Sequence, residues 1–232
     1  MPIRTAAHSI EIESYVETHL VQQQPGLIHA RENSLKHGIP TIAVSTVQGK
    51  FLSLLTSLSG AQNVLEIGTL GGYSSIWFAQ TTKARGGKLT SIEIDSSRRE
   101  VALQNLQVAG INVPTEAEIL LGAALDVLPK LAEEISAGTR PKFDFVFIDA
   151  DWENQWRYFD LAVGLSKGKG SVIYVDNVVK EILESGIVGP EKRNETVTPL
   201  VEKVGQDGRV EAVVMQTIGA KQHDGFLMAV VK

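Results

Sequence analysis

The sequence contains no cysteine, which excludes disulfide bonds, thiolate zinc sites and cysteine nucleophiles together. It also lacks a long apolar run, because the longest, Phe226 to Val231, has six residues, whereas about 18 are needed to span a bilayer. The start of the chain, Met1 to Tyr15, has no apolar stretch of signal-peptide length and carries two acidic residues. We therefore expect a cytoplasmic protein with no membrane partner.

An excess of positive charge is absent as well, since 22 lysines and arginines stand against 27 aspartates and glutamates. Such a balance offers little attraction to a phosphate backbone, so no nucleic acid partner is expected. Neither G-x-S-x-G nor a Walker sequence occurs, which argues against a serine hydrolase and a nucleotide triphosphatase. The 232 residues, 43% of them hydrophobic, suit one large domain, and we expect a single domain over residues 1–232.

What the chain does contain is an alternation of strand-like and helix-like segments from about residue 46 onward. Several expected strands are nearly continuous apolar runs, as strands buried on both faces require. We therefore predict an α/β fold: a seven-stranded, mostly parallel sheet with helices on both faces and an antiparallel hairpin at its C-terminal edge. The expected strands are Asn63–Ile67, Leu89–Ile94, Ala117–Leu121, Phe143–Ile148, Ser171–Val175, Arg209–Gln216 and Phe226–Val231.

Residues 1–40 precede this alternation and read as two helices, the second of which ends at Gly38, just before Pro40. They either cover the active site or bury a dimer interface, and the sequence does not choose between these roles. A homodimer is expected. The polar stretch Gly186–Glu195 is expected to form an exposed loop or flap.

The first expected strand runs into a glycine-rich turn, Gly68-Thr69-Leu70-Gly71-Gly72, that leads into a helix. Glycines there let a ligand approach the backbone near the positive end of the helix. The spacing is not the dinucleotide pattern G-x-G-x-x-G, so a phosphate cradle is weakly supported. Glu93 ends the second strand, where an acid can accept both ribose hydroxyls of an adenosine ligand. A tight turn and a solvated strand end are the alternative interpretations.

Carboxylates and an amide follow the fourth and fifth strands, at Asp149 and at Asp176-Asn177. The carboxyl ends of adjacent central strands meet at the ligand crevice of an open parallel sheet, so we expect these three side chains to lie together. Oxygen donors without cysteine or histidine suit a hard cation such as Mg²⁺. Helix capping is the alternative role for these residues.

With these features in place, the chain resembles the cation-dependent, S-adenosylmethionine-using O-methyltransferases, the group that contains catechol and caffeoyl-coenzyme A O-methyltransferases. The resemblance runs from about His37 to the C-terminus and implies a Rossmann-like class I methyltransferase fold. It rests on residues 44–49, V-L-E-I-G-T-L-G-G-Y-S at 64–74, S-I-E-I-D at 91–95, G-A-A-L-D-V-L-P at 122–129, F-I-D-A-D at 147–151, V-D-N-V at 175–178, and D-G-F near the end.

The resemblance implies a role for each motif in binding S-adenosylmethionine. The methionine tail would lie near Val44, Gly68 and Ser74, the ribose on Glu93, and the adenine edge beside Ala124. Glu66 and Asp149 would flank the methionine amino group. Asp149, Asp176 and Asn177 look like the metal triad, which makes Asp149 the expected catalytic residue.

One position departs from the family pattern. Many members have a lysine directly after D-A-D, where it resembles a general base, but this chain has Trp152 there. Trp152 supplies either an aromatic wall for a planar substrate or buried packing. Without the family's lysine, either the metal alone or another group activates the attacking hydroxyl. One hypothesis names Lys180 as that group. In that case Lys180→Ala would abolish methylation while cofactor binding persists.

The leading functional hypothesis is a magnesium-dependent O-methyltransferase that acts on a catechol-like or other small aromatic acceptor, because a metal on two adjacent oxygens would activate and orient the attacking hydroxyl. Two alternatives stay open at this point. One is an NAD-dependent oxidoreductase on a similar sheet. The other is a non-catalytic protein that binds S-adenosylmethionine, which the exchange of lysine for Trp152 favours. The N-terminal segment and the Gly186–Glu195 loop are expected to define the acceptor.

Overall fold

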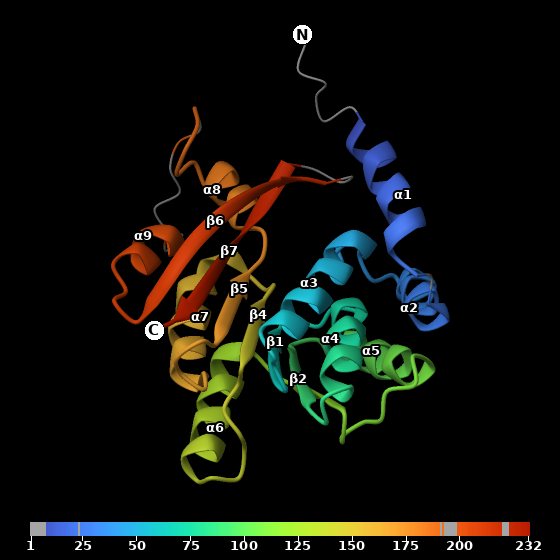
Figure 1. Ribbon diagram of the computed structural model, residues 1–232, viewed down its shortest axis with the longest axis horizontal. Coiled ribbons are helices and arrows are strands. Elements are labelled where there is room, and N and C mark those ends of the chain that lie inside the picture. The colour runs from blue at the N-terminus through green and yellow to red at the C-terminus, as the bar shows by residue number, and fades with distance from the viewer. Residues whose placement is uncertain (1–7, 23, 191, 193–198, 220–222) are drawn as a thin grey trace.

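The computed structural model describes residues 8–22, 24–190, 192, 199–219 and 223–232. Its seven strands form one sheet, shown in Figure 1 with the surrounding helices. The strands are β1 (Asn63–Ile67), β2 (Lys88–Glu93), β3 (Ala117–Leu121), β4 (Phe145–Ile148), β5 (Val172–Val175), β6 (Val210–Ile218) and β7 (His223–Val231). The helices are α1 (Ser9–Leu20), α2 (Pro25–Lys36), α3 (Thr46–Leu58), α4 (Tyr73–Lys83), α5 (Ser96–Val108), α6 (Ala124–Ser136), the short 3₁₀ helix η2 (Trp152–Asn154), α7 (Gln155–Leu165), α8 (Val178–Glu184) and α9 (Leu200–Gly205).

The strand order is β3-β2-β1-β4-β5-β7-β6. The first five strands in this order pair in parallel, and β7 pairs antiparallel with both β5 and β6. The predicted seven-stranded, mostly parallel sheet with a C-terminal antiparallel hairpin is therefore confirmed. Because the chain winds one way from β1 to β3 and the other way from β4 onward, the order reverses between β1 and β4, which is where sheets of this kind bind ligands.

Helices cover both faces of the sheet, as the apolar strands predicted. On one face, Leu65, Ile67, Val146 and Ile148 pack with helices α6, α7 and α9. On the other face, alternate residues of the same strands pack with α2, α3, α4 and α5 (Figure 1). Burial on both sides explains why β1, β4 and β5 are nearly continuous apolar runs rather than alternating ones.

Strand ends differ from the prediction by a few residues. The fourth strand begins at Phe145, because Phe143 makes only an isolated bridge to Ser166. The hairpin is longer than expected, since β6 and β7 stay in register from Val210 opposite Val231 to Ile218 opposite His223. A ladder of this length continues through polar residues, which sequence alternation does not mark as strand.

The two predicted N-terminal helices form α1 and α2, which differ in their relation to the core. Helix α2 packs against α5, where Asn33 Nδ2 donates to Asn105 Oδ1 at 2.8 Å, and Leu27 and Ala30 are buried. Helix α1 buries none of its residues. It lies at the end of the molecule toward which the β6–β7 hairpin points (Figure 1).

Helix α2 ends before Gly38, as predicted, and Gly38 has a positive φ of 71°. The predicted loop Gly186–Glu195 begins in a turn after α8, but its residues 191 and 193–195 lie outside the described residues. Within the described ranges, every helix is too short or too polar to cross a lipid bilayer.

Candidate active site

The glycine turn after β1 contacts the backbone just after β4, at the point where the strand order reverses. Gly68 follows β1 with φ of 100°, and a Cβ atom placed on it would lie 2.0 Å from the carbonyl oxygen of Asp149. Any side chain at residue 68 would therefore displace the end of β4. The close contact at Gly68 is with the backbone of Asp149, and the predicted close approach of a ligand stays a prediction.

Glu66 lies fully buried beneath the turn, at the end of β1. Its carboxylate accepts hydrogen bonds from Ser74 Oγ at 2.5 Å, from Ser91 Oγ at 2.6 Å and from Ser75 Oγ. Burial raises the pKa of Glu66 to about 7, although the three hydroxyls lower it. The structure thus joins two residues expected at the cofactor, Glu66 and Ser74, in one hydrogen bond.

Glu93 fixes the glycine turn from the neighbouring strand. It is 4% exposed, and its carboxylate accepts the backbone N–H of Leu70 at 2.8 Å and that of Asp95 at 3.0 Å. Leu70 has a positive φ of 53°, which is uncommon for a residue with a side chain, and the bond to Glu93 holds it there. Glu93 is therefore built into the turn and is not a solvated strand end.

The remaining expected cofactor residues flank this turn. Val44 is buried just before α3 and lines a groove of about 510 Å³ together with Leu70, Gly71 and Tyr73. Ala124 begins α6 and packs on the face of the sheet that α6 covers. Val44 and Ala124 thus lie on different faces of the sheet.

Asp149, Asp176 and Asn177 come together at the ends of β4 and β5, as expected. Asn177 Nδ2 donates to Asp149 Oδ1 at 2.9 Å. Gln48 Nε2 donates to both oxygens of Asp176, at 3.0 and 2.9 Å. Asn177 adopts a positive φ of 61°, a conformation that asparagine tolerates better than most residues. Its amide holds Asp149 and does not cap α8, since α8 has no side-chain cap.

The two aspartates bring negative charges close together at the ends of β4 and β5. Burial, followed by the negative charge of Asp149, raises the pKa of Asp176 well above its ordinary value, and the negative charge of Asp224 adds a smaller contribution. A cation would remove the conflict, because it would offset both charges. Two carboxylates and an amide oxygen also match the ligands that a hard divalent cation prefers.

The candidate metal triad is small by the standard of protein metal sites. In the part of the chain that the structure describes, no three histidine, cysteine, aspartate or glutamate side chains group around one point. A cation at this triad would thus have two carboxylate ligands and one amide, and would rely on water or substrate oxygens for the rest. Magnesium accepts such a site, since it usually keeps several waters.

Trp152 and Lys180 lie against each other beside the triad. The Nζ atom of Lys180 is 5.5 Å from the centre of the Trp152 ring, within the range of a cation–π contact, and 3.9 Å from Glu184. The backbone N–H of Lys180 donates to Asp224 Oδ1 at 2.9 Å. A lysine amine thus lies next to the residue that stands where many family members have their lysine.

The sequence predicted no role for three residues that the structure brings into the site: Gln48, Ser91 and Asp224. Gln48 is a polar residue amid the apolar positions of α3, and that break in the pattern is a usable signal. Ser91 lies inside a buried strand, where a hydroxyl needs a partner. Asp224 belongs to the D-G-F motif of the resemblance, but no role was assigned to it, because it lies where the hairpin loop was expected.

The chain matches known O-methyltransferases over nearly its whole length. The family model described as O-methyltransferase matches residues 17–229. The O-methyltransferase imqG of Aspergillus flavus is 40% identical over 95% of this chain and 90% of its own. A catechol O-methyltransferase of Niastella koreensis is 36% identical over 95% of this chain and 96% of its own. The crystal structure of the O-methyltransferase TomG from Streptomyces achromogenes, in complex with S-adenosylmethionine, superposes with a TM-score of 0.87, at 34% identity, over 99% of this chain and 100% of that one.

Proposed function

This chain belongs to the O-methyltransferase family, and from that premise we propose that it methylates a hydroxyl of a catechol-like or other small aromatic acceptor with the help of a divalent cation, Mg²⁺ first among them. The enzyme transfers the methyl group of S-adenosylmethionine to oxygen. The observation that carries the proposal is the group Asp149, Asp176 and Asn177 beside the glycine turn. The two alternatives, an NAD-dependent oxidoreductase and a non-catalytic binding protein, find no support in these relatives.

The chain's own residues would hold the donor from three sides. Gly68 has no Cβ, so the carbonyl oxygen of Asp149 packs directly against the glycine turn at the proposed donor site. Glu93 has its carboxylate beside the turn, where its remaining lone pairs can accept ribose hydroxyls. In the same proposal the methionine tail lies near Val44 and Ser74, its amino group between Glu66 and Asp149, and the adenine edge beside Ala124.

The metal would be held by Asp149, Asp176 and Asn177. As a member of this triad, Asp149 is the proposed catalytic residue. A bound divalent cation would supply positive charge that lowers the pKa of an acceptor hydroxyl. Gln48 holds both oxygens of Asp176 in place, so that this carboxylate is oriented before any ligand arrives. Because Asp176 is buried, water screens its negative charge less, and its attraction to a cation would be stronger.

Lys180 belongs to the proposal as the residue that replaces the missing lysine. Its amine lies beside Trp152 and adds a positive charge near the triad. We expect Lys180→Ala to abolish methylation while the dissociation constant of S-adenosylhomocysteine stays within about twofold. Near-normal turnover in this variant would remove Lys180 from the mechanism.

The test of the metal role is turnover of a panel of small phenols with and without Mg²⁺. Turnover should disappear in EDTA and return when Mg²⁺ is added in excess. Calorimetry with S-adenosylhomocysteine in EDTA is the control, because cofactor binding should persist without metal. Full activity in EDTA would overturn the metal role, and the absence of turnover with every phenol would overturn the acceptor class.

A homodimer in the cytoplasm completes the proposal. Helices α1 and α3 carry exposed apolar side chains, among them Tyr15 at 66% and Leu58 at 84% exposed. The proposal is that these side chains are covered when two copies of the chain associate. Sedimentation of the purified chain should give a mass near twice 25.1 kDa, and a sharp monomer boundary at micromolar concentration would contradict it.

A further inference from the structure

Asp176, which follows β5, is held by two glutamines from opposite faces of the sheet. On one face, Gln48 at the start of α3 donates to both carboxylate oxygens of Asp176, at 3.0 and 2.9 Å. On the other face, Gln155 at the start of α7 donates from Nε2 to the backbone carbonyl oxygen of Asp176 at 3.3 Å. Helices α3 and α7 pack in the two separate cores that cover the sheet. One glutamine therefore holds the side chain of Asp176, and the other holds its main chain.

The carbonyl of Asp176 lies just before α8, and the first turn of that helix does not provide it with a donor. In a regular helix this carbonyl would accept the N–H group four residues later, that of Lys180. Instead, the N–H of Lys180 donates to Asp224 Oδ1 at 2.9 Å. A buried carbonyl needs a donor from elsewhere, and Gln155 supplies it. The bond also bears on Asn177, because the same peptide group leads into its uncommon backbone conformation, with φ of 61°.

Gln155 gains little net stability in this position. It is 2% exposed, and its Oε1 atom is buried without a hydrogen-bond partner among the described residues. A buried oxygen without a donor opposes folding, and the bond that Nε2 makes at 3.3 Å is long for its kind. An apolar side chain of similar length would fill the same space without the unpaired oxygen. The presence of an amide here is therefore better explained by what it holds than by stability.

We infer that Gln155 is a positioning residue for the metal triad. It fixes the peptide group between Asp176 and Asn177 from the face opposite Gln48, so that the amide of Asn177 stays on Asp149 in the absence of a cation. Ligand residues that are held in advance lose less freedom when a cation binds. The part of the inference that concerns cation affinity rests on the proposed function, and the part that concerns the shape of the triad does not.

The first test needs no metal. Gln155→Met keeps the length of the side chain and removes its donor. In EDTA, NMR should show the side-chain amide protons of Asn177 exchanging with solvent about fivefold faster or more, because their bond to Asp149 opens more often. The midpoint of urea unfolding should stay within about 0.3 M, because the carbonyl of Asp176 loses its donor while the unpaired Oε1 is removed.

Two results of this test would overturn the inference. Unchanged exchange at Asn177 would show that Gln155 does not hold the triad. Faster exchange together with a fall of the urea midpoint by about 1 M or more would show that Gln155 is only a structural residue.

The second test measures cation binding without turnover. The probe is Mn²⁺, whose free ion gives a strong EPR signal, with S-adenosylhomocysteine present at saturation. The dissociation constant of Mn²⁺ should rise about tenfold in Gln155→Met, as is typical when a residue that orients metal ligands is lost. The dissociation constant of S-adenosylhomocysteine should stay within about twofold. Equal Mn²⁺ affinity in the variant and the wild type would contradict the positioning role.

Gln206→Met is the matched control, because it makes the same substitution at an exposed glutamine at the end of α9. It should change neither the exchange at Asn177 nor the affinity for Mn²⁺, and equal changes in the two variants would refute a particular role for Gln155. If the wild type binds no Mn²⁺ but exchange at Asn177 rises in Gln155→Met, the proposed metal role fails and the positioning stands. If the wild type and Gln155→Met bind Mn²⁺ equally well, the metal role stands and the positioning fails.

Discussion

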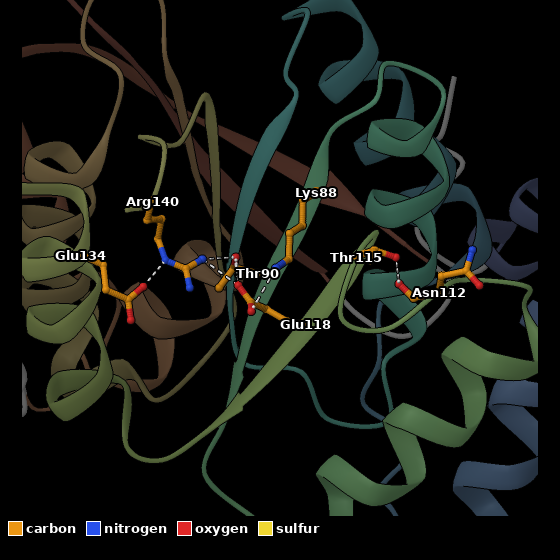
Figure 2. A network of polar contacts seen from close by, with 7 residues as sticks. All are labelled: Lys88, Thr90, Asn112, Thr115, Glu118, Glu134 and Arg140. Atoms are coloured by element: carbon orange, nitrogen blue, oxygen red, sulfur yellow. Dashed lines mark hydrogen bonds and ion pairs between the residues drawn. The ribbon is translucent and has the colours of Figure 1, made fainter. Parts of the chain in front are cut away.

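Carboxylates at the two ends of the sheet have different kinds of partner: cations at the amino end, and hydroxyls and amides at the carboxyl end. At the amino end, Glu118 accepts hydrogen bonds from Arg140 Nη1 at 2.7 Å and from Thr90 Oγ1 at 2.9 Å, and forms an ion pair with Lys88 at 3.1 Å (Figure 2). Arg140 Nε also donates to Glu134 at 2.6 Å, so one guanidinium binds two carboxylates. Every charge in this network has a partner of the opposite sign.

At the carboxyl end, Glu66 and Asp176 are buried with hydroxyls and amides as their hydrogen-bond partners. The pKa values diverge accordingly. Burial would raise the pKa of Glu118, but Arg140, Lys88 and Thr90 together lower it. Burial raises the pKa of Glu66 to about 7 and that of Asp176 well above its ordinary range. The acids at the amino end are thus compensated by cations of the protein itself, whereas those at the carboxyl end are the kind of perturbed groups typical of functional sites.

The largest expected effect is at the triad. Asp176→Asn should lower kcat/KM by about 100-fold or more, because it removes a proposed metal ligand. Unfolding free energy in EDTA should stay equal or rise by about 1 kcal/mol, because repulsion from Asp149 disappears. Steady-state kinetics and urea titrations check both. Asp160→Asn, which alters an exposed pair with Arg209, is the control and should change neither. A stability loss at Asp176 that matches the activity loss would contradict the comparison.

The second effect is the pH dependence of stability that Glu66 causes. Its pKa is raised from an ordinary 4.5 to about 7 in the folded state, so the folded protein keeps a proton that the unfolded chain has lost. Glu66 thus destabilises the fold progressively as pH rises from 4.5 to about 7, by on the order of 3 kcal/mol.

Glu66→Gln should remove this part of the slope. Urea unfolding of the variant and of the wild type at pH 5 and at pH 8 would measure it, and the variant should gain relative stability at the higher pH. Equal slopes in the two proteins would show that Glu66 has no raised pKa.

The third effect has the opposite sign and lies at the amino end. The pKa of Glu118 is lowered in the folded state, so its pairing stabilises the protein above the ordinary pKa of 4.5 and is lost as pH falls through the folded pKa. Glu118→Gln should cost about 1–2 kcal/mol at pH 7, after allowance for solvent screening, and progressively less as pH falls below 4.5. Turnover at saturating substrate should not change. Loss of activity without loss of stability would break the contrast between the two ends.

The smallest effect is at Lys88, whose side chain is 34% exposed in its pair with Glu118. Lys88→Ala should cost about 0.5 kcal/mol of unfolding free energy, because Arg140 and Thr90 still hold the glutamate. The cost should shrink in about 1 M salt, since exposed charges are screened there. A salt-independent loss would place the pair in a drier environment than its exposure indicates.

Much of the fold followed from local pattern. The apolar runs of β1, β4 and β5 predicted a parallel sheet with both faces covered by helices. The glycine turn and the strand-end acids also followed, because parallel strands bring their carboxyl ends to one edge. These features depend on residues close together in the chain or on one topological rule.

Contacts between distant segments did not follow. Gln48 reaches Asp176 across 128 positions, and Ser91 reaches Glu66 across 25, and neither partner is marked by spacing. The contact between Lys180 and Trp152 was likewise invisible in the chain, although both residues had been singled out. The amino-end network escaped notice for the same reason, because Arg140 is an ordinary surface residue until the sheet assembles around it.

Helix α1 buries none of its own residues, yet it lines a groove of about 520 Å³ that reaches Asp176 and Asn177. Substitutions on the side of α1 that faces this groove would therefore cost little folding free energy. Under the proposed function, in which the N-terminal segment helps to define the acceptor, natural drift and directed evolution could both alter acceptor choice there without a compensating change elsewhere. A library confined to Ile12, Glu13 and Val16 would then test whether specificity changes while the cofactor sheet is left as it is.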